Sequence, residues 1–208
     1  FFLIIGFGYG FSSAITALLG NALGKKRYKL ASIYAHKGLV FVPLIGLTLS
    51  IIGYFFAPSL FMFLGAKDEY LQISLDYINP ILFGAIFFMF NFSLNSILIA
   101  TGDTKTYRNS LIFGFFANLA LNPLFMYGFL FIPAMGIKGI AFATVLIQII
   151  NMFYLFYKVL QTKLIHFEKL EYFIPNIRIY KQFLTQGIPS SLNMLTMAIG
   201  SLILTYFV

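Results

Sequence analysis

Long apolar stretches separated by short polar connections dominate the pattern of this chain. Each stretch holds Gly or Pro, and none holds Asp, Glu or Arg. A helix needs about 20 apolar residues to cross the hydrocarbon core of a bilayer, which is about 30 Å thick. The pattern therefore predicts an all-α, polytopic membrane protein with six transmembrane helices. The stretches lie near residues 1–23, 37–64, 78–100, 110–132, 136–157 and 187–208.

Both ends of the sequence are expected to lie within spans. The first stretch has no basic leader and no initial Met, and a charged turn follows it instead of a small-residue cleavage site. These features favour a transmembrane span over a signal peptide. The last stretch runs to Val208 without a polar ending. We therefore expect the sequence to be a piece of a longer protein.

The segment 158–186 is the only long polar segment of the chain. Its mixture of Lys, Glu, Tyr, Ile and Phe predicts an amphipathic helix that lies on the inner membrane surface. Pro175 and Pro189 are expected to break the chain on either side of the second part of this segment. The segment is the expected seam between two halves of the full-length protein.

Composition supports a lipid environment. Hydrophobic residues make up 60% of the chain and charged residues 10%, against roughly 25% charged in an average soluble domain. The net charge of +8 does not favour nucleic acid as a partner, because the Lys and Arg residues cluster between apolar runs instead of along a polar face. Such clustering is typical of proteins that meet anionic lipid headgroups.

The basic residues also predict the orientation of the helices. Of the 14 Lys and Arg residues, 12 lie in the connections after the first, third and fifth stretches, and only Lys67 and Lys138 lie in the other two. Lys and Arg in short loops are retained on the cytoplasmic side. We therefore expect the richer connections, including segment 158–186, to be cytoplasmic and both Phe1 and Val208 to be outside.

Several kinds of chemistry find no support in the sequence. The chain has no Cys, so it offers no disulfide, thiol nucleophile or thiolate metal site. His36 and His166 lie among basic residues at the ends of apolar runs, where we expect contact with water rather than metal binding. No catalytic motif of the GxSxG or HExxH type and no phosphate-binding glycine loop occurs. We expect neither an enzyme nor a cofactor.

Small residues and amides recur within the spans. Gly6, Gly10 and Ala14, and separately Gly20 and Gly24, follow a spacing of four that allows close helix approach in lipid. Buried amides need partners in lipid, so they either bond other helices or line a pathway for a solute or cation. Both alternatives stay open for the three amide pairs, which are Asn91 with Asn95, Asn118 with Asn122, and Gln148 with Asn151.

Acidic residues are expected only in or beside the connections. An ion-coupled transporter normally needs a carboxylate inside the helix bundle. Either that carboxylate lies in a segment outside this sequence, or the protein is not ion-coupled. The six acids are Asp68, Glu69, Asp76, Asp103, Glu168 and Glu171.

Five motifs together resemble the MATE (multidrug and toxic compound extrusion) transporter family, in the family's order and over nearly the whole chain. The sequence GDTK, followed by an Asn-containing helix and then by GIAFAT, is the most specific combination. The branch that it resembles most is that of the DNA-damage-inducible exporters. The motifs are SSAITALLGNALGKKR at 12–27, ATGDTK at 100–105, NLALNPLFMYG at 118–128, GIKGIAFATVLIQ at 136–148 and GIPSS at 187–191.

The resemblance implies a secondary exporter with two lobes of six helices, which works by alternating access and exchanges protons or sodium for organic, often cationic, drugs or toxins. The chain would hold helices two to seven of twelve. Residues 1–157 would belong to the N-terminal lobe, 158–186 to the inter-lobe linker and 187–208 to the C-terminal lobe. An essential Asp would lie on the absent first helix. A monomer in the plasma (inner) membrane of a bacterium or archaeon is implied.

The resemblance also assigns residues. Tyr77, Asn118, Asn122 and Thr144 match positions of a polar network around the coupling Asp. Asn122 stands where many relatives have Asp, which removes a second proton acceptor. Further residues are expected to line a substrate cavity, in which methionine supplies adaptable apolar surface; they are Asn91, Asn95, Gln148, Met89, Asn193 and Met194.

Two other functions remain as alternatives. A lipid-linked saccharide flippase of the same superfamily would be expected to place Arg or Lys within its cavity, to bind pyrophosphate. No such residue is expected deep in any span. A membrane scaffold without transport activity is the third hypothesis, and it would gain support if no second six-helix half existed.

Overall fold

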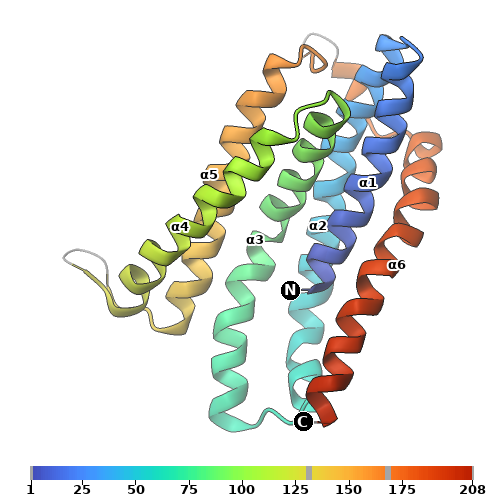
Figure 1. Cartoon of the computed structure of the whole chain (residues 1–208). Helices are drawn as coiled ribbons and strands as arrows, with labels where there is room; N and C mark the ends of the chain where they lie inside the picture. Colours follow the sequence, from blue (N-terminus) through green and yellow to red (C-terminus); the bar gives the residue numbers. More distant parts are fainter. Residues whose placement is uncertain (1, 130–132, 167–169, 208) are drawn as a thin grey trace.

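The structure, a computed structural model, describes residues 2–129, 133–166 and 170–207, and these ranges are almost entirely helical (Figure 1). The expected all-α class is confirmed. Helices α1 to α5 are each long and apolar enough to cross a membrane. Phe1, Val208 and the expected end of the fourth span at 130–132 lie outside the described residues. The elements are α1 (Phe2–Gly24), α2 (Tyr28–Phe63), α3 (Asp68–Ala100), α4 (Lys105–Tyr127), α5 (Ile137–Gln161), the short 3₁₀ helix η1 (Leu170–Tyr172) and α6 (Ile177–Phe207).

Three helices begin about ten residues earlier than the apolar pattern predicts. Helix α2 has 36 residues and, at about 1.5 Å per residue, is far longer than a hydrocarbon core of about 30 Å. An apolar run identifies only the part of a helix that lies in the hydrocarbon core, and the helix can extend beyond it. The polar turns that precede this part in α2, α3 and α6 continue the helix because neither Gly nor Pro interrupts them.

Within the described part of segment 158–186, the one separate helical element is the three-residue η1. Its first residues end α5, and residues 177–186 are the first turns of α6. Pro175 lies in the connection just before α6, as expected of a breaker. Pro189 lies inside α6 without ending it, so the expected break at Pro189 is absent.

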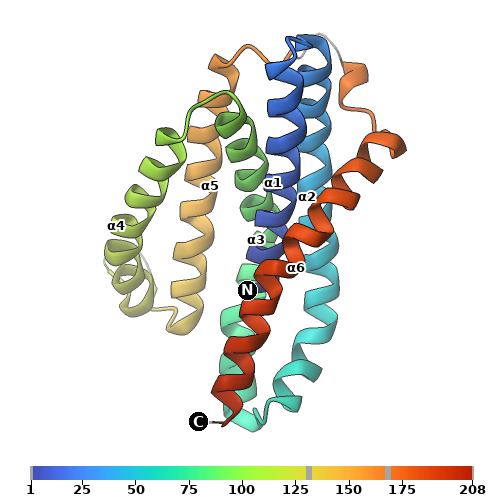
Figure 2. The same cartoon turned by 45° about the vertical axis from the view of Figure 1, so that its right-hand side comes forward.

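Helix α3 is central, and it packs against α1, α2 and α5 (Figures 1 and 2). Helix α6 lies mainly along α1, and α4 packs on the far side of α5. The connections 25–27 and 101–104 and the described parts of the connection after α5, 162–166 and 170–176, gather at one end of the bundle, which we call the basic end. The connection 64–67 and the described residues 128–129 and 133–136 lie at the opposite end, as the alternation of basic residues predicts.

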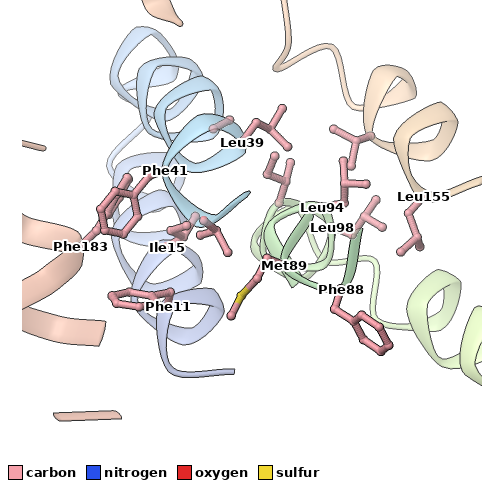
Figure 3. Packing of buried hydrophobic residues seen from close by; sticks show 14 of the residues in the cluster. Phe11, Ile15, Leu39, Phe41, Phe88, Met89, Leu94, Leu98, Leu155 and Phe183 are labelled. Carbon is pink, nitrogen blue, oxygen red and sulfur yellow. The ribbon is translucent and has the colours of Figure 1, made fainter. Parts of the chain in front are cut away.

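Apolar side chains from α1, α2, α3, α5 and α6 fill the interior (Figure 3). The rings of Phe11 and Phe41 meet edge to face at 5.3 Å, and Phe183 of α6 packs against Phe41 at 5.5 Å. Lipid is as apolar as this core, so close packing rather than removal from water holds the helices together. The buried aromatic rings therefore fix α6 against α1 and α2.

Close helix contacts occur at only some of the expected glycines. A Cβ atom on Gly10 would overlap the backbone of Ser191 on α6, so Gly10 allows α1 and α6 to touch. A Cβ atom on Gly20 or Gly24 would meet no neighbouring atom within 4 Å, so these two glycines make no close helix contact within the described residues. They lie in the last two turns of α1.

Two helices are each followed, two residues after their last residue, by a lysine in the left-handed backbone region. Lys26 follows α1 with φ 55° and Lys163 follows α5 with φ 56°, whereas Gly65 and Gly102 take the comparable positions after α2 and α3. The Arg27 N–H donates to the Ala22 carbonyl and the Lys26 N–H to the Leu23 carbonyl, which closes the end of α1. A side chain in this region costs about 1 kcal/mol relative to glycine.

Candidate functional site

The contact between α4 and α5 brings together two residues of the network that the resemblance assigns, Asn118 and Thr144. The Thr144 hydroxyl of α5 is 3.5 Å from Oδ1 of Asn118 on α4, and it also lies 3.0 Å from the Ile140 carbonyl. Asn122 lies one turn further along α4, and its buried Oδ1 has no hydrogen-bond partner. Tyr77 lies on α3, where its side chain is 38% exposed. The amides therefore supply acceptor oxygens at this contact.

A second polar contact joins α5 to α3. Nδ2 of Asn91, which is buried, donates to Oε1 of Gln148 at 2.8 Å and to the Gln148 carbonyl at 2.9 Å. Oδ1 of Asn91 is buried without a partner. Gln148 follows Thr144 by one turn, so α5 presents polar groups to the helices on both of its sides.

Asn95 turns toward α1 instead of α5. It lines a cavity of about 300 Å³ together with Ser12, Ser13 and Thr16 of α1, and its buried Oδ1 is unpaired. Asn151 on α5 is buried close to Gly114 of α4. The amides that share a helix therefore meet different neighbours, and sequence spacing alone does not show which helix each one faces.

The three remaining cavity candidates occupy two environments. Met89 is fully buried, and its side chain packs against Gly46 of α2 in the hydrophobic core. Asn193 and Met194 of α6 are exposed on the surface of the described bundle. Met89 therefore contributes to packing between α2 and α3, while the two α6 residues are free to contact another part of a longer protein.

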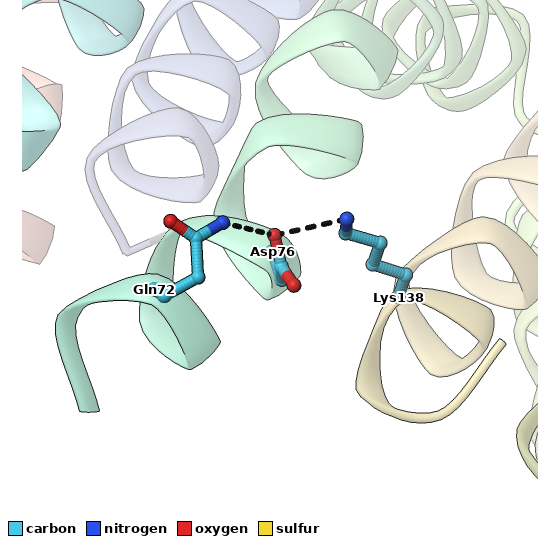
Figure 4. A network of polar contacts seen from close by, with 3 residues as sticks. All are labelled: Gln72, Asp76 and Lys138. Atoms are coloured by element: carbon cyan, nitrogen blue, oxygen red, sulfur yellow. Dashed lines mark hydrogen bonds and ion pairs between the residues drawn. The ribbon is translucent and has the colours of Figure 1, made fainter. Parts of the chain in front are cut away.

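One carboxylate lies further inside a helix than expected. Asp76 is in the third turn of α3, because α3 begins earlier than predicted, and its Oδ1 lies 3.1 Å from Nζ of Lys138 (Figure 4). Nε2 of Gln72 donates to the same oxygen at 2.9 Å. This ion pair joins α3 to the start of α5 beside a cavity of about 500 Å³. Sequence reasoning missed it, because the two residues are 62 positions apart.

Whether these groups could bind a coupling ion depends on the oxygen ligands that they offer. Amide oxygens of Asn91, Asn95 and Asn122 are buried and unpaired, and such oxygens are suitable ligands for a hard cation. Firm binding also requires a carboxylate. Within residues 2–129, 133–166 and 170–207, no cluster of three acidic or His side chains suitable for a metal ion occurs. The described residues therefore supply amide ligands for a cation but not the carboxylate that firm binding needs.

His36 departs from the expected contact with water. Its ring is fully buried; Nδ1 lies 2.7 Å from the Ser32 carbonyl, and Nε2 accepts the His166 backbone N–H at 3.0 Å. The rings of Tyr172 and Phe173 pack edge-on against it. The connection after α5 folds over α2 and covers this position, which explains the wrong expectation. His166 itself is exposed, as predicted.

Lys37 is held by the same connection. It lies inside α2, its side chain is buried, and its ammonium group donates to the carbonyls of Glu171 and Ile174. The Ser32 hydroxyl donates to the Leu164 carbonyl at 2.7 Å. Side chains of α2 therefore fix the described parts of this connection, 162–166 and 170–176, through their backbone. Sequence reasoning missed this role, since Lys37 resembles any other lysine at the edge of a span.

Comparison with known proteins places these features in a family. The MatE family model matches residues 1–124. The probable multidrug resistance protein YoeA of Bacillus subtilis (strain 168) is 31% identical over 212 residues, which cover all of this chain and 46% of that protein. The chain thus spans about half the length of the curated relatives that it matches.

Solved structures agree with this match. An inward-facing structure of a multidrug resistance MATE transporter is 28% identical with a TM-score of 0.85, and covers 96% of this chain and 44% of its own. An outward-facing structure of such a transporter is also 28% identical with a TM-score of 0.84, and covers 97% and 44%. The similarity includes α6 and is about equal for the two conformations. The chain belongs to the MatE family of membrane transporters.

Proposed function

We propose that the full-length protein is a secondary active exporter that moves organic, often cationic, drugs or toxins out of the cell. The family is one of transporters rather than enzymes, and similar proteins carry names of multidrug resistance proteins. The apolar helices and the family make the chain part of an integral membrane protein. We place it in the plasma (inner) membrane of a bacterium or archaeon, as a monomer, with the linker 158–186 in the cytoplasm.

The unpaired amide oxygens carry this proposal. Asn91, Asn95 and Asn122 each bury an acceptor without a partner in helices long enough to cross a membrane. Leaving such groups unpaired in a low-dielectric interior costs free energy. A cation, a protonated carboxylate or a polar part of a substrate would satisfy them. In the proposed exchange, the coupling ion (a proton or sodium) and the substrate would bond these amide oxygens in turn.

Alternating access is the proposed mechanism of this exchange. Inward- and outward-facing relatives differ in which side of the membrane their cavity opens to, yet this chain resembles both about equally. A unit that keeps its internal packing in both states fits rigid-body movement of one half of a transporter against the other. The close packing of α1, α2, α3 and α5 around the aromatic core supports such a unit.

The flippase alternative is not favoured. It requires a Lys or Arg that is available to a pyrophosphate inside the cavity. Lys37 is the buried lysine of the described spans, but its ammonium group is already held by the carbonyls of Glu171 and Ile174. Lys138 is paired with Asp76. Neither is available to a lipid-linked pyrophosphate without losing these contacts.

The variant Asn118→Ala tests the exporter proposal. Asn118 is proposed to bond the coupling carboxylate of the full-length protein, and a hydrogen bond to a charged group is worth about 1.5–3 kcal/mol. We expect ion-driven efflux from vesicles to fall by about tenfold or more, with membrane insertion unchanged. Asn109→Ala on the same helix, at the basic end, is the matched control. Efflux of Asn118→Ala at the wild-type rate would contradict the assignment.

A further inference from the structure

Two cavities meet at the basic end of the bundle, away from the amides. The larger, of about 750 Å³, lies between the ends of α1, α3 and α5 and the start of α2. The smaller, of about 610 Å³, lies beside the same first turn of α2. Tyr28 and Lys29 line both cavities, so the two spaces adjoin at the start of α2.

Basic side chains line both cavities. Lys29 and Lys163 line the larger cavity beside His166, and Lys26, Arg27 and Lys29 line the smaller one. None of the described residues that line the two cavities is acidic. Among the described residues, the one Lys–carboxylate ion pair is Lys138 with Asp76, at the opposite end. None of these lining lysines therefore forms an ion pair with a described carboxylate.

The larger cavity also has neutral hydrogen-bonding groups. Ser32, Thr101 and Thr162 contribute hydroxyls, and Tyr28 and Tyr172 contribute aromatic walls. The bond from the Ser32 hydroxyl to the Leu164 carbonyl fixes one wall of the cavity to another. The space is therefore built by side-chain contacts between α2 and the connection after α5.

The backbone of two lysines gives an independent indication. Lys26 and Lys163 are the residues that end α1 and α5 in the left-handed region, where glycine would be less strained. Each of them lines one of the two cavities. A cation near a helix C-terminus is favourable, but any position in the last turn provides that benefit with ordinary backbone angles. Strain that persists at a cationic cavity points to a function of the side chain.

We propose that the two cavities form a binding site for a phosphate group, held by Lys26, Lys29 and Lys163. The phosphate can belong to the headgroup of an anionic phospholipid or to a small soluble phosphate. Charge-assisted hydrogen bonds from lysines to phosphate oxygens would neutralise the cluster. The site lies where the predicted orientation meets the negatively charged cytoplasmic leaflet.

Removing the two strained lysines tests the site in the purified full-length protein. Phosphatidylglycerol is titrated into phosphatidylcholine–detergent micelles, and bound lipid and thermal unfolding are both measured. The double variant Lys26→Gly/Lys163→Gly should bind phosphatidylglycerol about tenfold more weakly or worse. Without anionic lipid it should unfold at the wild-type temperature or above, because glycine accommodates both backbone angles.

A matched control separates the site from general surface charge. The double variant Lys25→Gln/Lys105→Gln removes two positive charges at the same end, and neither residue lines the cavities. It should keep its affinity for phosphatidylglycerol within about twofold, since charge alone acts through a screened field. Unchanged affinity of the glycine variant, or an equal loss in the control, would overturn the proposal. Lys29→Gln provides a second test, because Lys29 lines both cavities and has ordinary helical backbone angles. It should also weaken the binding of phosphatidylglycerol.

Inorganic phosphate and glycerol phosphate distinguish the two sources of the ligand. If they raise the unfolding temperature of the wild type and compete with phosphatidylglycerol, the site accepts soluble phosphates. If only the lipid acts, the ligand is a headgroup. Either result must disappear in the glycine variant for the site to stand. The measurement is of binding, so it remains valid if the exporter proposal fails.

Discussion

Asn91 and Asn122 both bury an amide oxygen without a partner, but Asn91 also makes a helix contact. The amide nitrogen of Asn91 donates to Gln148 on the neighbouring helix. Removing a group that bonds a neighbouring helix leaves its partner unpaired and costs stability. Removing an unpaired buried oxygen has no such cost, because that oxygen is itself unfavourable.

Replacing each of them with leucine separates packing from transport. Asn91→Leu should lower the stability of the full-length protein by about 1–3 kcal/mol, because it leaves Gln148 unpaired. Asn122→Leu should leave the unfolding temperature unchanged or raise it, and yet reduce ion-driven efflux. Thermal unfolding in detergent and efflux from vesicles are measured for both variants. A marked loss of stability in Asn122→Leu would show that its role is structural.

Asp103, in the connection between α3 and α4, gives a prediction about pH. The Thr106 hydroxyl donates to Oδ2 at 2.5 Å and the Thr106 N–H to Oδ1 at 2.9 Å, and these bonds hold the pKa of Asp103 below its usual value. A lowered folded-state pKa means that the carboxylate stabilises the fold above about pH 4, its unfolded pKa, and that this contribution disappears as the pH falls through the folded pKa.

The comparison of wild type with Asp103→Asn tests this linkage. The wild type should unfold at a higher temperature from pH 7 down to about pH 5, and the difference should shrink below about pH 4. Thermal unfolding over this range provides the measurement. A difference that grows on acidification would mean that Asp103 is stabilised in its protonated form, contrary to its hydrogen bonds.

At the scale of whole helices, the sequence predicted the spans better than their edges. Apolar runs located all the long helices because lipid selects for continuous hydrophobicity. They missed the polar first turns of α2, α3 and α6, since these turns lie beyond the apolar part. His36 was misplaced for a related reason: its burial depends on a connection more than 120 residues later in the chain that folds back over α2.

Helix spacing motifs were only partly informative. The spacing of four in α1 predicts a contact face but not which glycines of that face meet another helix. Gly10 touches α6 at Ser191, and Gly187 of α6 faces Phe11 in return. In the same way, the candidate amides were found from their residue types, while the pairing of Asn91 with Gln148 required knowledge of which helices are neighbours.

The pair Gly10→Ala and Gly20→Ala measures the contact between α1 and α6. A methyl group at Gly10 would overlap the backbone of α6, which cannot yield as a flexible side chain would, so we expect a loss of about 1–3 kcal/mol. Gly20 has open space around it, and alanine there should be neutral or stabilising by up to about 1 kcal/mol. Thermal unfolding of both variants is compared. Equal stability would contradict the close approach of the two helices.

At the scale of the molecule, the orientation in the membrane is the property that links all of the proposals. This chain has no cysteine, so in a full-length protein with any other cysteines replaced by serine, a single introduced cysteine reports its side of the membrane. Thr104→Cys, at the basic end, should resist membrane-impermeant thiol reagents in intact cells. Ala66→Cys, at the opposite end, should react readily. The reverse labelling pattern would invert the predicted topology and would move the proposed phosphate site to the outer surface.

The connection after α5 is bonded to α2 at several positions, and this attachment links α2 to α6. Ser32 and His36 bond the backbone of Leu164 and His166, and Lys37 donates to the carbonyls of Glu171 and Ile174. Tyr34 donates to Oε1 of Gln182 on α6 at 3.0 Å. If the full-length protein works by the proposed rigid-body movement, a displacement of α6 would pass to α2 through these bonds instead of being absorbed by a loosely attached connection.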